Sequence, residues 1–203
     1  EMKQLVKQEM KSGAMGLSTG LVYMPGRYAD TEELIELVSV VAEYGGMYAS
    51  HIRNQGKKIT ESILEAIEIG EKNDTRVEIS HIKLCIEPNW GRPEMITNPV
   101  EQARARGVEV FTDQYPYNAT SSGFSSSFPD WSLEGGNDKL VERLKNKKMY
   151  KKIKDYIIQK RLTSVTGIDK LSTIYIGNYE RQPDWEGKNL REILLSRSKK
   201  PTI

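Results

Sequence analysis

The two histidines of this 203-residue chain stand in matching sequence contexts and are the residues best suited to bind a metal ion. His51 lies in the sequence ASHIR and His81, 30 residues later, in ISHIK. Each follows a short run typical of a strand, and about 30 residues is the length of one strand-plus-helix unit. Such spacing would place the two imidazoles on neighbouring parallel strands, where both could bind one zinc ion. Two histidines buried in a core are the alternative, but the repeated pattern of serine, histidine, isoleucine and a basic residue favours the metal site.

Four strand-like runs recur at intervals of about 30 residues and must position these histidines: 14–18, 47–52, 76–82 and 108–113. The segments between them have helical periodicity. We expect one helix to be capped by Asp30, a second by Thr60, and a third to begin at Asn98 and Pro99 and to end at Gly107. The sequence therefore predicts a parallel α/β fold, either an open sheet or part of a (β/α)8 barrel, in which active sites lie at the carboxyl ends of the strands.

The composition changes after Tyr117. Residues 120–136 are rich in serine and glycine and are predicted to form a surface loop or lid. A basic helix is predicted over 139–161, a last strand over 172–176 and a helix from about 189 to 196. We divide the chain into central βα units over 1–119, a lid insertion with the basic helix over 120–170, and a return to the barrel over 171–203.

The overall composition is that of an ordinary globular chain. Its net charge is +2, it has one cysteine, Cys85, and no apolar run approaches the roughly 20 residues that span a membrane. These features predict no membrane or nucleic-acid partner, a reducing compartment and a cytoplasmic location. The first residue is not methionine, and an amphipathic helix is already under way there, so we expect the chain to be part of a longer protein. The sequence does not predict an oligomeric state.

Six motifs along the chain occur in the order and spacing of one enzyme family: GAMGLSTGL at 13–21, YMPGR at 23–27, HIRN at 51–54, ISHIK at 79–83, NWG at 89–91 and DQYPY at 113–117. With them, the sequence resembles the N-acyl-D-amino-acid deacylases, or D-aminoacylases, of the amidohydrolase superfamily. The similarity is dense from Gly13 to Ser122, and WEGKNLREI at 185–193 resembles the family segment that follows the lid.

The resemblance implies part of a TIM-type (β/α)8 barrel with a lid insertion, which binds zinc and hydrolyses the amide bond of N-acyl-D-amino acids. By position, His51 and His81 match zinc ligands of the family. Lys83, Tyr115 and Ser121 match positions that hold the substrate. Arg53 could attract a substrate carboxylate, but it could equally pair with a neighbouring acid.

Several functional residues of the family have no counterpart in this chain. These are an N-terminal His-x-His pair, a metal-bridging cysteine, and a later catalytic aspartate with its nearby arginine. Asp113 lies on a different strand and is expected to be structural, while Cys85 lies past a strand end and is a poor candidate ligand. We therefore assign no catalytic residue to this chain and expect it to have no deacylase activity by itself.

Three other functions compete with this interpretation. GLSTG at 16–20 fits the nucleophile-elbow pattern of serine hydrolases, with Asp74 and His81 as its partners, but a loop with a Pro-Gly turn follows it instead of a helix. The basic segment 145–161 could bind nucleic acid, although acidic residues interrupt it. Ring-opening amidohydrolases, such as dihydroorotases and hydantoinases, share strand-end histidines but would not be expected to carry the GLSTGL and YPY motifs together.

Overall fold

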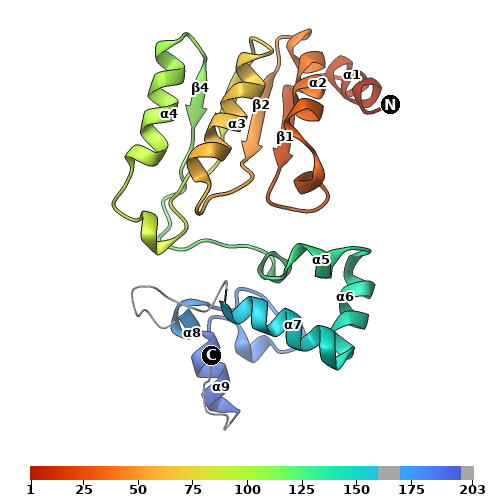
Figure 1. Ribbon diagram of the computed structural model, residues 1–203, viewed down its shortest axis with the longest axis vertical. Helices are drawn as coiled ribbons and strands as arrows, with labels where there is room; N and C mark the ends of the chain where they lie inside the picture. Colours follow the sequence, from red (N-terminus) through yellow and green to blue (C-terminus); the bar gives the residue numbers. More distant parts are fainter. Residues whose placement is uncertain (160–169, 198–203) are drawn as a thin grey trace. The chain divides into compact units, whose positions relative to one another are not determined.

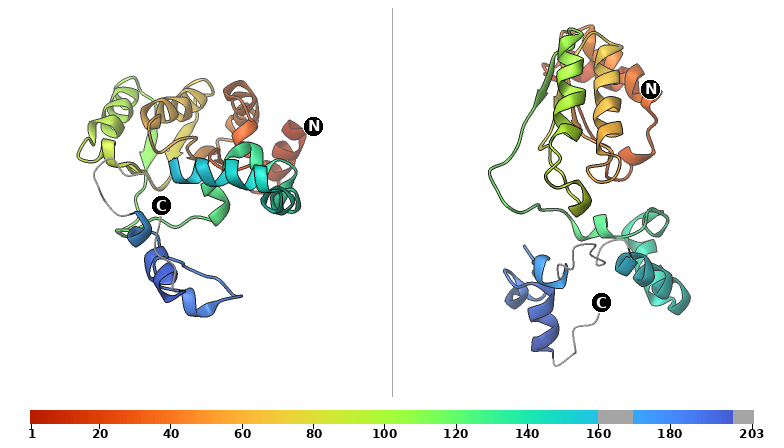
Figure 2. Two further views of the ribbon diagram at one scale, coloured as in Figure 1. Left: turned by 60° about the horizontal axis from the view of Figure 1, so that its bottom comes forward. Right: turned by 60° about the vertical axis from the view of Figure 1, so that its left-hand side comes forward.

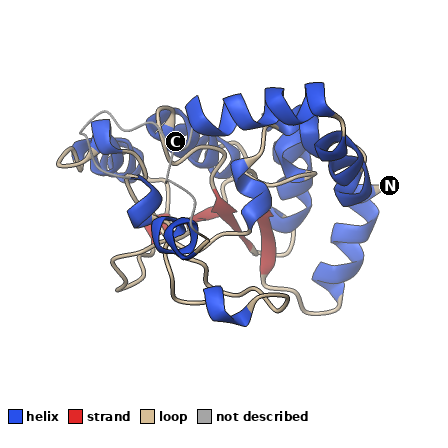
Figure 3. Ribbon diagram, turned by 90° about the horizontal axis from the view of Figure 1, so that it is seen from below, coloured by secondary structure: helices blue, strands red, loops and turns tan. Residues whose placement is uncertain are grey.

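The computed structural model describes residues 1–159 and 170–197, which form two compact units divided after Tyr117. In the first unit, strands and helices alternate along the chain (Figure 1), and Figure 3 shows the strands in red and the helices in blue. The strands are β1 (Gly16–Gly20), β2 (Met47–His51), β3 (Arg76–Ile79) and β4 (Val110–Thr112). They form a parallel sheet in the order β1-β2-β3-β4. The predicted parallel α/β fold is thus confirmed.

The helices of the first unit pack against one another, and those that follow β1 also pack against this sheet. They are α1 (Met2–Lys11), α2 (Thr31–Ala42), α3 (Ile59–Glu71) and α4 (Glu94–Ala105), with short 3-10 turns at Gly26–Tyr28 and Glu87–Asn89. Each of α2, α3 and α4 contacts the strand that follows it, and neighbouring helices touch. Figure 2 shows α3 and α4 side by side. The helix start at Asp30 is as predicted, since its carboxylate accepts the Glu33 amide hydrogen.

The two faces of the sheet differ in burial. Tyr48, Val77, Ile79 and Val110 are buried in the core with apolar residues of α2, α3 and α4. The opposite face carries a row of residues in register across the four strands, namely Ser18, Ala49, Glu78 and Phe111. In that row Ser18 and Phe111 are exposed. The alternation of strand side chains therefore turns one face toward the helices and leaves the other accessible.

Helix α4 begins five residues before the predicted start at Pro99. A proline inside a helix donates no hydrogen bond to the carbonyl four residues earlier, which here is that of Met95. The Thr60 hydroxyl of α3 donates to the Met95 oxygen instead, at 2.9 Å. The prediction that Thr60 caps α3 is therefore wrong. Its hydroxyl instead gives the Met95 carbonyl of the neighbouring helix the hydrogen bond that Pro99 cannot donate. A contact between residues 35 positions apart explains both differences.

The second unit begins at Asn118 and contains short helices. They are α5 (Asp130–Leu133), α6 (Gly136–Lys145), α7 (Lys147–Ile157), α8 (Lys170–Thr173) and α9 (Leu190–Ser196). Phe128, Leu140 and Ile153 form a small core under α5, α6 and α7. The serine-rich segment 120–136 is thus partly helical, and the 3-10 turn Phe124–Ser127 precedes α5.

The predicted basic helix over 139–161 is in fact two helices. Asn146 separates α6 from α7, and its side chain accepts the amide hydrogens of Lys148 and Met149, which caps α7. Lys151 pairs with Asp155, and the Lys152 ammonium lies 4.3 Å from the centroid of the Trp131 ring. The last two residues of the predicted basic run, 160 and 161, lie outside the described residues.

The prediction of a strand over 172–176 is wrong. Its first residues belong to α8, and the segment pairs only through two isolated bridges, Tyr175 with Asn189 and Ile176 with Glu186. Because the two bridges differ in direction, they form no continuous ladder. The predicted helix after residue 189 is confirmed as α9, where Asn189 and Glu192 form a capping box. No helix among the described residues has the length and apolar character of a membrane span.

Candidate metal and substrate site

The two histidines lie together at the carboxyl edge of the sheet. His51 is the last residue of β2, and His81 stands two residues beyond the end of β3. Their ring centroids are 4.4 Å apart and the rings meet edge to face. Because β2 and β3 are parallel neighbours, their carboxyl ends lie at the same edge of the sheet, and so do the histidines at those ends. The structure thus brings the two predicted zinc ligands into contact.

The backbone at His81 has a conformation that is uncommon for a residue other than glycine, with φ at +41°. Asp113, just after β4, holds this turn from the neighbouring strand. Its carboxylate accepts the His81 amide hydrogen at 2.7 Å, and its carbonyl accepts the Ile82 amide hydrogen at 2.9 Å. Asp113 thereby has a structural role beneath His81.

Gln55 and Lys83 surround the Nδ1 atom of His81. Lys83 Nζ lies 3.1 Å from this nitrogen and Gln55 Nε2 lies 3.3 Å from it. Lys83 also donates to Gln55 Oε1 at 3.0 Å and to the His81 carbonyl. The Cys85 thiol lies at the edge of this group, 3.5 Å from Gln55 Oε1. A lysine predicted to contact substrate is therefore adjacent to a predicted metal ligand.

Two tyrosines border the histidines on opposite sides. The Tyr23 ring lies 5.0 Å from that of His51, and the Tyr115 ring lies 6.4 Å from that of His81. Lys83 Nζ stands 5.1 Å from the centroid of the Tyr115 ring. The Tyr115 hydroxyl oxygen is buried and has no hydrogen-bond partner within the described part of the chain. His51, His81, Lys83 and Tyr115 thus form one cluster.

Burial shifts the pKa values of three side chains in this cluster. Burial lowers the pKa of His51 to about 4, and the nearby His81 and Lys83 contribute to the shift. Burial also lowers the pKa of Lys83 and raises that of Tyr115. A histidine with such a low pKa is neutral at physiological pH, and neutral imidazole is the form that binds a metal ion.

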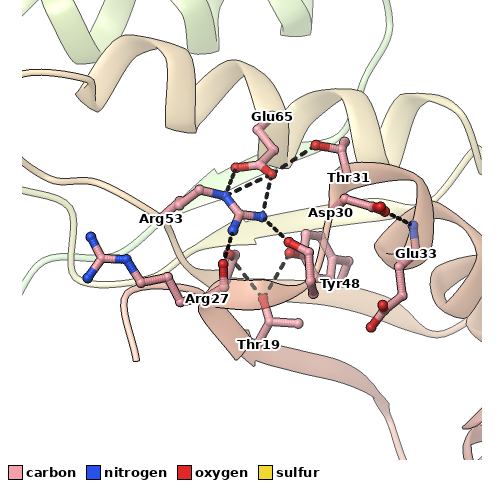
Figure 4. Close-up of polar contacts among 10 residues, drawn as sticks. Thr19, Arg27, Asp30, Thr31, Glu33, Tyr48, Arg53 and Glu65 are labelled. Atoms are coloured by element: carbon pink, nitrogen blue, oxygen red, sulfur yellow. Dashed lines mark hydrogen bonds and ion pairs between the residues drawn. The ribbon is translucent and has the colours of Figure 1, made fainter. Parts of the chain in front are cut away.

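Arg53 does not point its charge into this cluster. Its guanidinium forms a two-pronged ion pair with Glu65 and donates to the carbonyls of Arg27 and Ala29 (Figure 4). Of the two roles that the sequence left open, the structure shows pairing with a neighbouring acid. We therefore do not include Arg53 among the proposed substrate-binding residues.

The other predicted residues are Ser121 and the members of the alternative serine triad. Ser121 is exposed and belongs to the second unit, whereas the cluster lies in the first. Ser18 lies in the middle of β1 rather than on a strand-to-helix turn. Asp74 and His81 flank opposite ends of β3. The geometry therefore excludes a serine triad of Ser18, Asp74 and His81.

Sequence reasoning missed three residues at this edge: Tyr23, Gln55 and Glu65. Gln55 hydrogen-bonds to His81 and Lys83, and Glu65 pairs with Arg53. These partners are 12 to 28 residues away in the sequence, so no local pattern reveals them. Tyr23 lies in a motif of the family resemblance, but nothing in the sequence relates its ring to His51. Among the described residues, no group of three or more histidine, cysteine, aspartate or glutamate side chains could hold a metal ion. His51 and His81 are thus a partial ligand set.

Glu78, on the accessible face of the sheet, provides a test of local electrostatics. Burial raises its pKa above 4.5, and the nearby Asp113 carboxyl raises it further. The folded state therefore binds this proton more tightly than the unfolded state, and stability falls as pH rises from about 4.5 through the folded pKa. Glu78→Gln is expected to raise the free energy of unfolding at pH 7 and to flatten this pH dependence.

Urea unfolding of the wild type and of Glu78→Gln at pH 4 and pH 7 measures this effect. Glu109→Gln, which changes an exposed glutamate just before β4, is the matched control. Lower stability of Glu78→Gln than of the wild type at pH 7 would contradict the prediction.

Comparison with known proteins finds deacylases among the relatives of this chain, although no protein-family model matches it. The D-aminoacylase of Alcaligenes xylosoxydans xylosoxydans is 41% identical over 121 residues, which are 60% of this chain and 25% of that protein. The N-acyl-D-glutamate deacylase of the same organism is 36% identical over 121 residues, with the same coverage. The chain therefore spans about a quarter of the length of the curated relatives it matches.

Solved structures agree with the sequence relatives. A D-aminoacylase crystal structure, described as defining a novel subset of amidohydrolases, matches with a TM-score of 0.68 and 30% identity over 98% of this chain and 33% of that one. The N-acyl-D-glutamate deacylase of Bordetella bronchiseptica, complexed with zinc and a phosphonate inhibitor, matches with a TM-score of 0.69 and 26% identity over 97% of this chain and 33% of that one. By sequence and by fold, this chain is thus a relative of the D-aminoacylases and N-acyl-D-glutamate deacylases, as its motifs predicted, and it corresponds to about a quarter to a third of their length.

Proposed function

We propose that this chain supplies part of the active site of a zinc-dependent enzyme that hydrolyses the amide bond of N-acyl-D-amino acids. One observation carries the proposal: the imidazoles of His51 and His81 lie 4.4 Å apart at adjacent strand ends, with Lys83 and Tyr115 beside them. The names of the relatives support the reaction and the substrate class. Since the chain spans only part of these relatives, the activity is proposed for a whole protein that includes this segment.

The two histidines fit a zinc site by their chemistry. Neutral imidazole is a preferred zinc ligand, and the lowered pKa of His51 keeps that ring neutral well below pH 7. Nδ1 of His81 accepts from the donor groups of Gln55 and Lys83, so it is the unprotonated nitrogen of the neutral ring, and a metal would bind there in place of these donors. When bound, zinc acidifies a water molecule and polarises the substrate carbonyl. The catalytic carboxylate and the other ligands would come from parts of the protein beyond these residues.

Lys83 and Tyr115 are proposed to hold the substrate next to that metal. The Lys83 ammonium can attract the α-carboxylate of an N-acyl amino acid. The buried Tyr115 hydroxyl lacks a partner among the described residues and could donate a second hydrogen bond. Ser121 is proposed to contact the substrate on the family resemblance alone.

The parallel sheet is proposed to be part of a closed (β/α)8 barrel. Helices cover one face, as they do outside such a barrel. The row of Ser18, Ala49, Glu78 and Phe111 on the other face would then line the interior. In this arrangement, the edge that carries His51 and His81 is the face at which barrel enzymes assemble their active sites.

The test is the release of amino acid by the protein in its natural full-length form. We expect hydrolysis of N-acetyl-D-methionine or N-acetyl-D-glutamate, loss of activity on chelation, and recovery on addition of zinc. The L-enantiomers and a hydantoin are the matched control substrates. Hydrolysis of the hydantoin alone would favour a ring-opening amidohydrolase, and activity that survives complete zinc removal would contradict the proposed chemistry.

A further inference from the structure

A cluster of charged and backbone groups ties helix α3 to the loop that follows β1. Arg53 Nη2 lies 2.7 Å from Glu65 Oε1, and Arg53 Nε lies 3.0 Å from Glu65 Oε2. The same guanidinium donates to the carbonyls of Arg27 and Ala29, each at 2.9 Å. Thr31, at the start of α2, donates its hydroxyl to Glu65 Oε1 at 3.0 Å (Figure 4).

The loop held by these contacts, Leu21–Asp30, passes beside His51. It begins where the Leu21 amide donates to the His51 carbonyl at 2.9 Å. Two residues later the Tyr23 ring meets the His51 ring. The Arg27 amide donates back to the Tyr23 carbonyl at 2.8 Å, so the part of the loop that Arg53 holds is bonded directly to Tyr23.

We propose that Arg53 and Glu65 are positioning residues that clamp the Leu21–Asp30 loop and thereby hold Tyr23 against His51. They act through the loop and do not touch metal or substrate. The clamp stands on the contacts described above, whereas its effect on the site rests on the proposed zinc-binding function.

The burial of this pair supports a role beyond that of a surface ion pair. The Arg53 and Glu65 side chains are only 27% and 14% exposed. Bidentate pairs between arginine and carboxylate have defined geometry, and loss of one partner leaves the other groups unpaired in a partly dry environment. The bond to Glu65 also raises the pKa of Arg53, which keeps the guanidinium charged.

The same helix carries a matched control at its other end. Glu71, the last residue of α3, pairs with Arg106 through two hydrogen bonds of 3.1 and 3.2 Å. These side chains are 44% and 49% exposed, and they lie beyond the amino ends of the strands, away from His51. Removal of this pair tests the general cost of losing an arginine–glutamate bridge from α3.

The experiment compares Glu65→Gln and Arg53→Lys with Glu71→Gln in the natural full-length protein. Limited trypsin digestion measures cleavage after the exposed Arg27, which reports opening of the loop. Competition with a chromophoric chelator measures zinc affinity. Both clamp variants are expected to be cleaved after Arg27 at least about tenfold faster than the wild type, because hydrogen bonds to a charged group are lost. Their zinc affinity is expected to fall by about 10- to 100-fold, as is typical of changes next to a ligand.

Glu71→Gln is expected to match the wild type in both measurements. Equal cleavage of Glu65→Gln, Glu71→Gln and wild type would overturn the clamp. Faster cleavage with unchanged zinc affinity would overturn its positioning role. Arg53→Lys retains the charge without the two-pronged geometry, and it decides the matter if Glu65→Gln does not fold. A wild-type protein that binds no zinc would instead refute the proposed function, and the digestion would still test the clamp.

Discussion

Replacement of His51 or His81 by glutamine is expected to lower the zinc affinity of the full-length protein by more than about 100-fold, since even changes around a ligand cost 10- to 100-fold. The deacylase activity should fall at least as far, because the metal is needed to polarise the amide and activate water. Glutamine keeps a polar side chain of similar length but has no imidazole nitrogen. Both rings lie on the same edge, 4.4 Å apart, so each loss should act on the same ion.

Lys83→Met is the matched control for the histidine variants. Lys83 lies next to a proposed metal ligand, since its Nζ is 3.1 Å from His81 Nδ1. Its own proposed partner, however, is the substrate carboxylate. We expect this variant to retain zinc and to show a raised KM. Zinc content is measured by elemental analysis and KM by steady-state kinetics. Histidine variants that bind zinc as tightly as the wild type would refute the assignment of these two ligands.

The second large effect is expected at Gly16 in β1. A Cβ atom at this position would lie 2.0 Å from the carbonyl oxygen of Met47, its register partner on β2. The obstacle is backbone rather than the end of a flexible side chain, so relief requires the two strands to move apart. Gly16→Ala is expected to cost at least about 3 kcal/mol, the upper part of the range for overpacking. For a chain of this size, that corresponds to a Tm lower by roughly 6–12 °C.

Gly177→Ala provides the control for Gly16→Ala. A Cβ atom at Gly177 would meet nothing within 4 Å, and the residue does not have a positive φ. Thermal unfolding followed by circular dichroism should therefore show a large loss for Gly16→Ala and little change for Gly177→Ala. A Gly16→Ala variant as stable as the control would mean that β1 and β2 do not approach as closely as described.

Local sequence was sufficient for features that depend on neighbouring residues. The strand-plus-helix period predicted that His51 and His81 would reach one edge, because equivalent positions of parallel units share a side of the sheet. The cap at Asp30 and the helix after Asn189 were correct for the same reason, since both depend on residues three positions apart. The prediction of a strand over 172–176 was wrong because a strand needs a partner strand to pair with, and the composition of the segment does not show whether one is present.

Within this chain, the sequence alone determined the parallel α/β fold, the relationship to the deacylases and the meeting of His51 and His81. Tertiary structure decided what the polar residues around them do. Arg53 could have faced a substrate, but Glu65, 12 residues later, takes its charge. Thr60 looked like a helix cap and instead serves the Met95 carbonyl left free by Pro99. Hydrogen-bonding groups bond to the partners that the fold brings within about 3 Å. When those partners lie on other elements, the residues next to them in the sequence do not predict them.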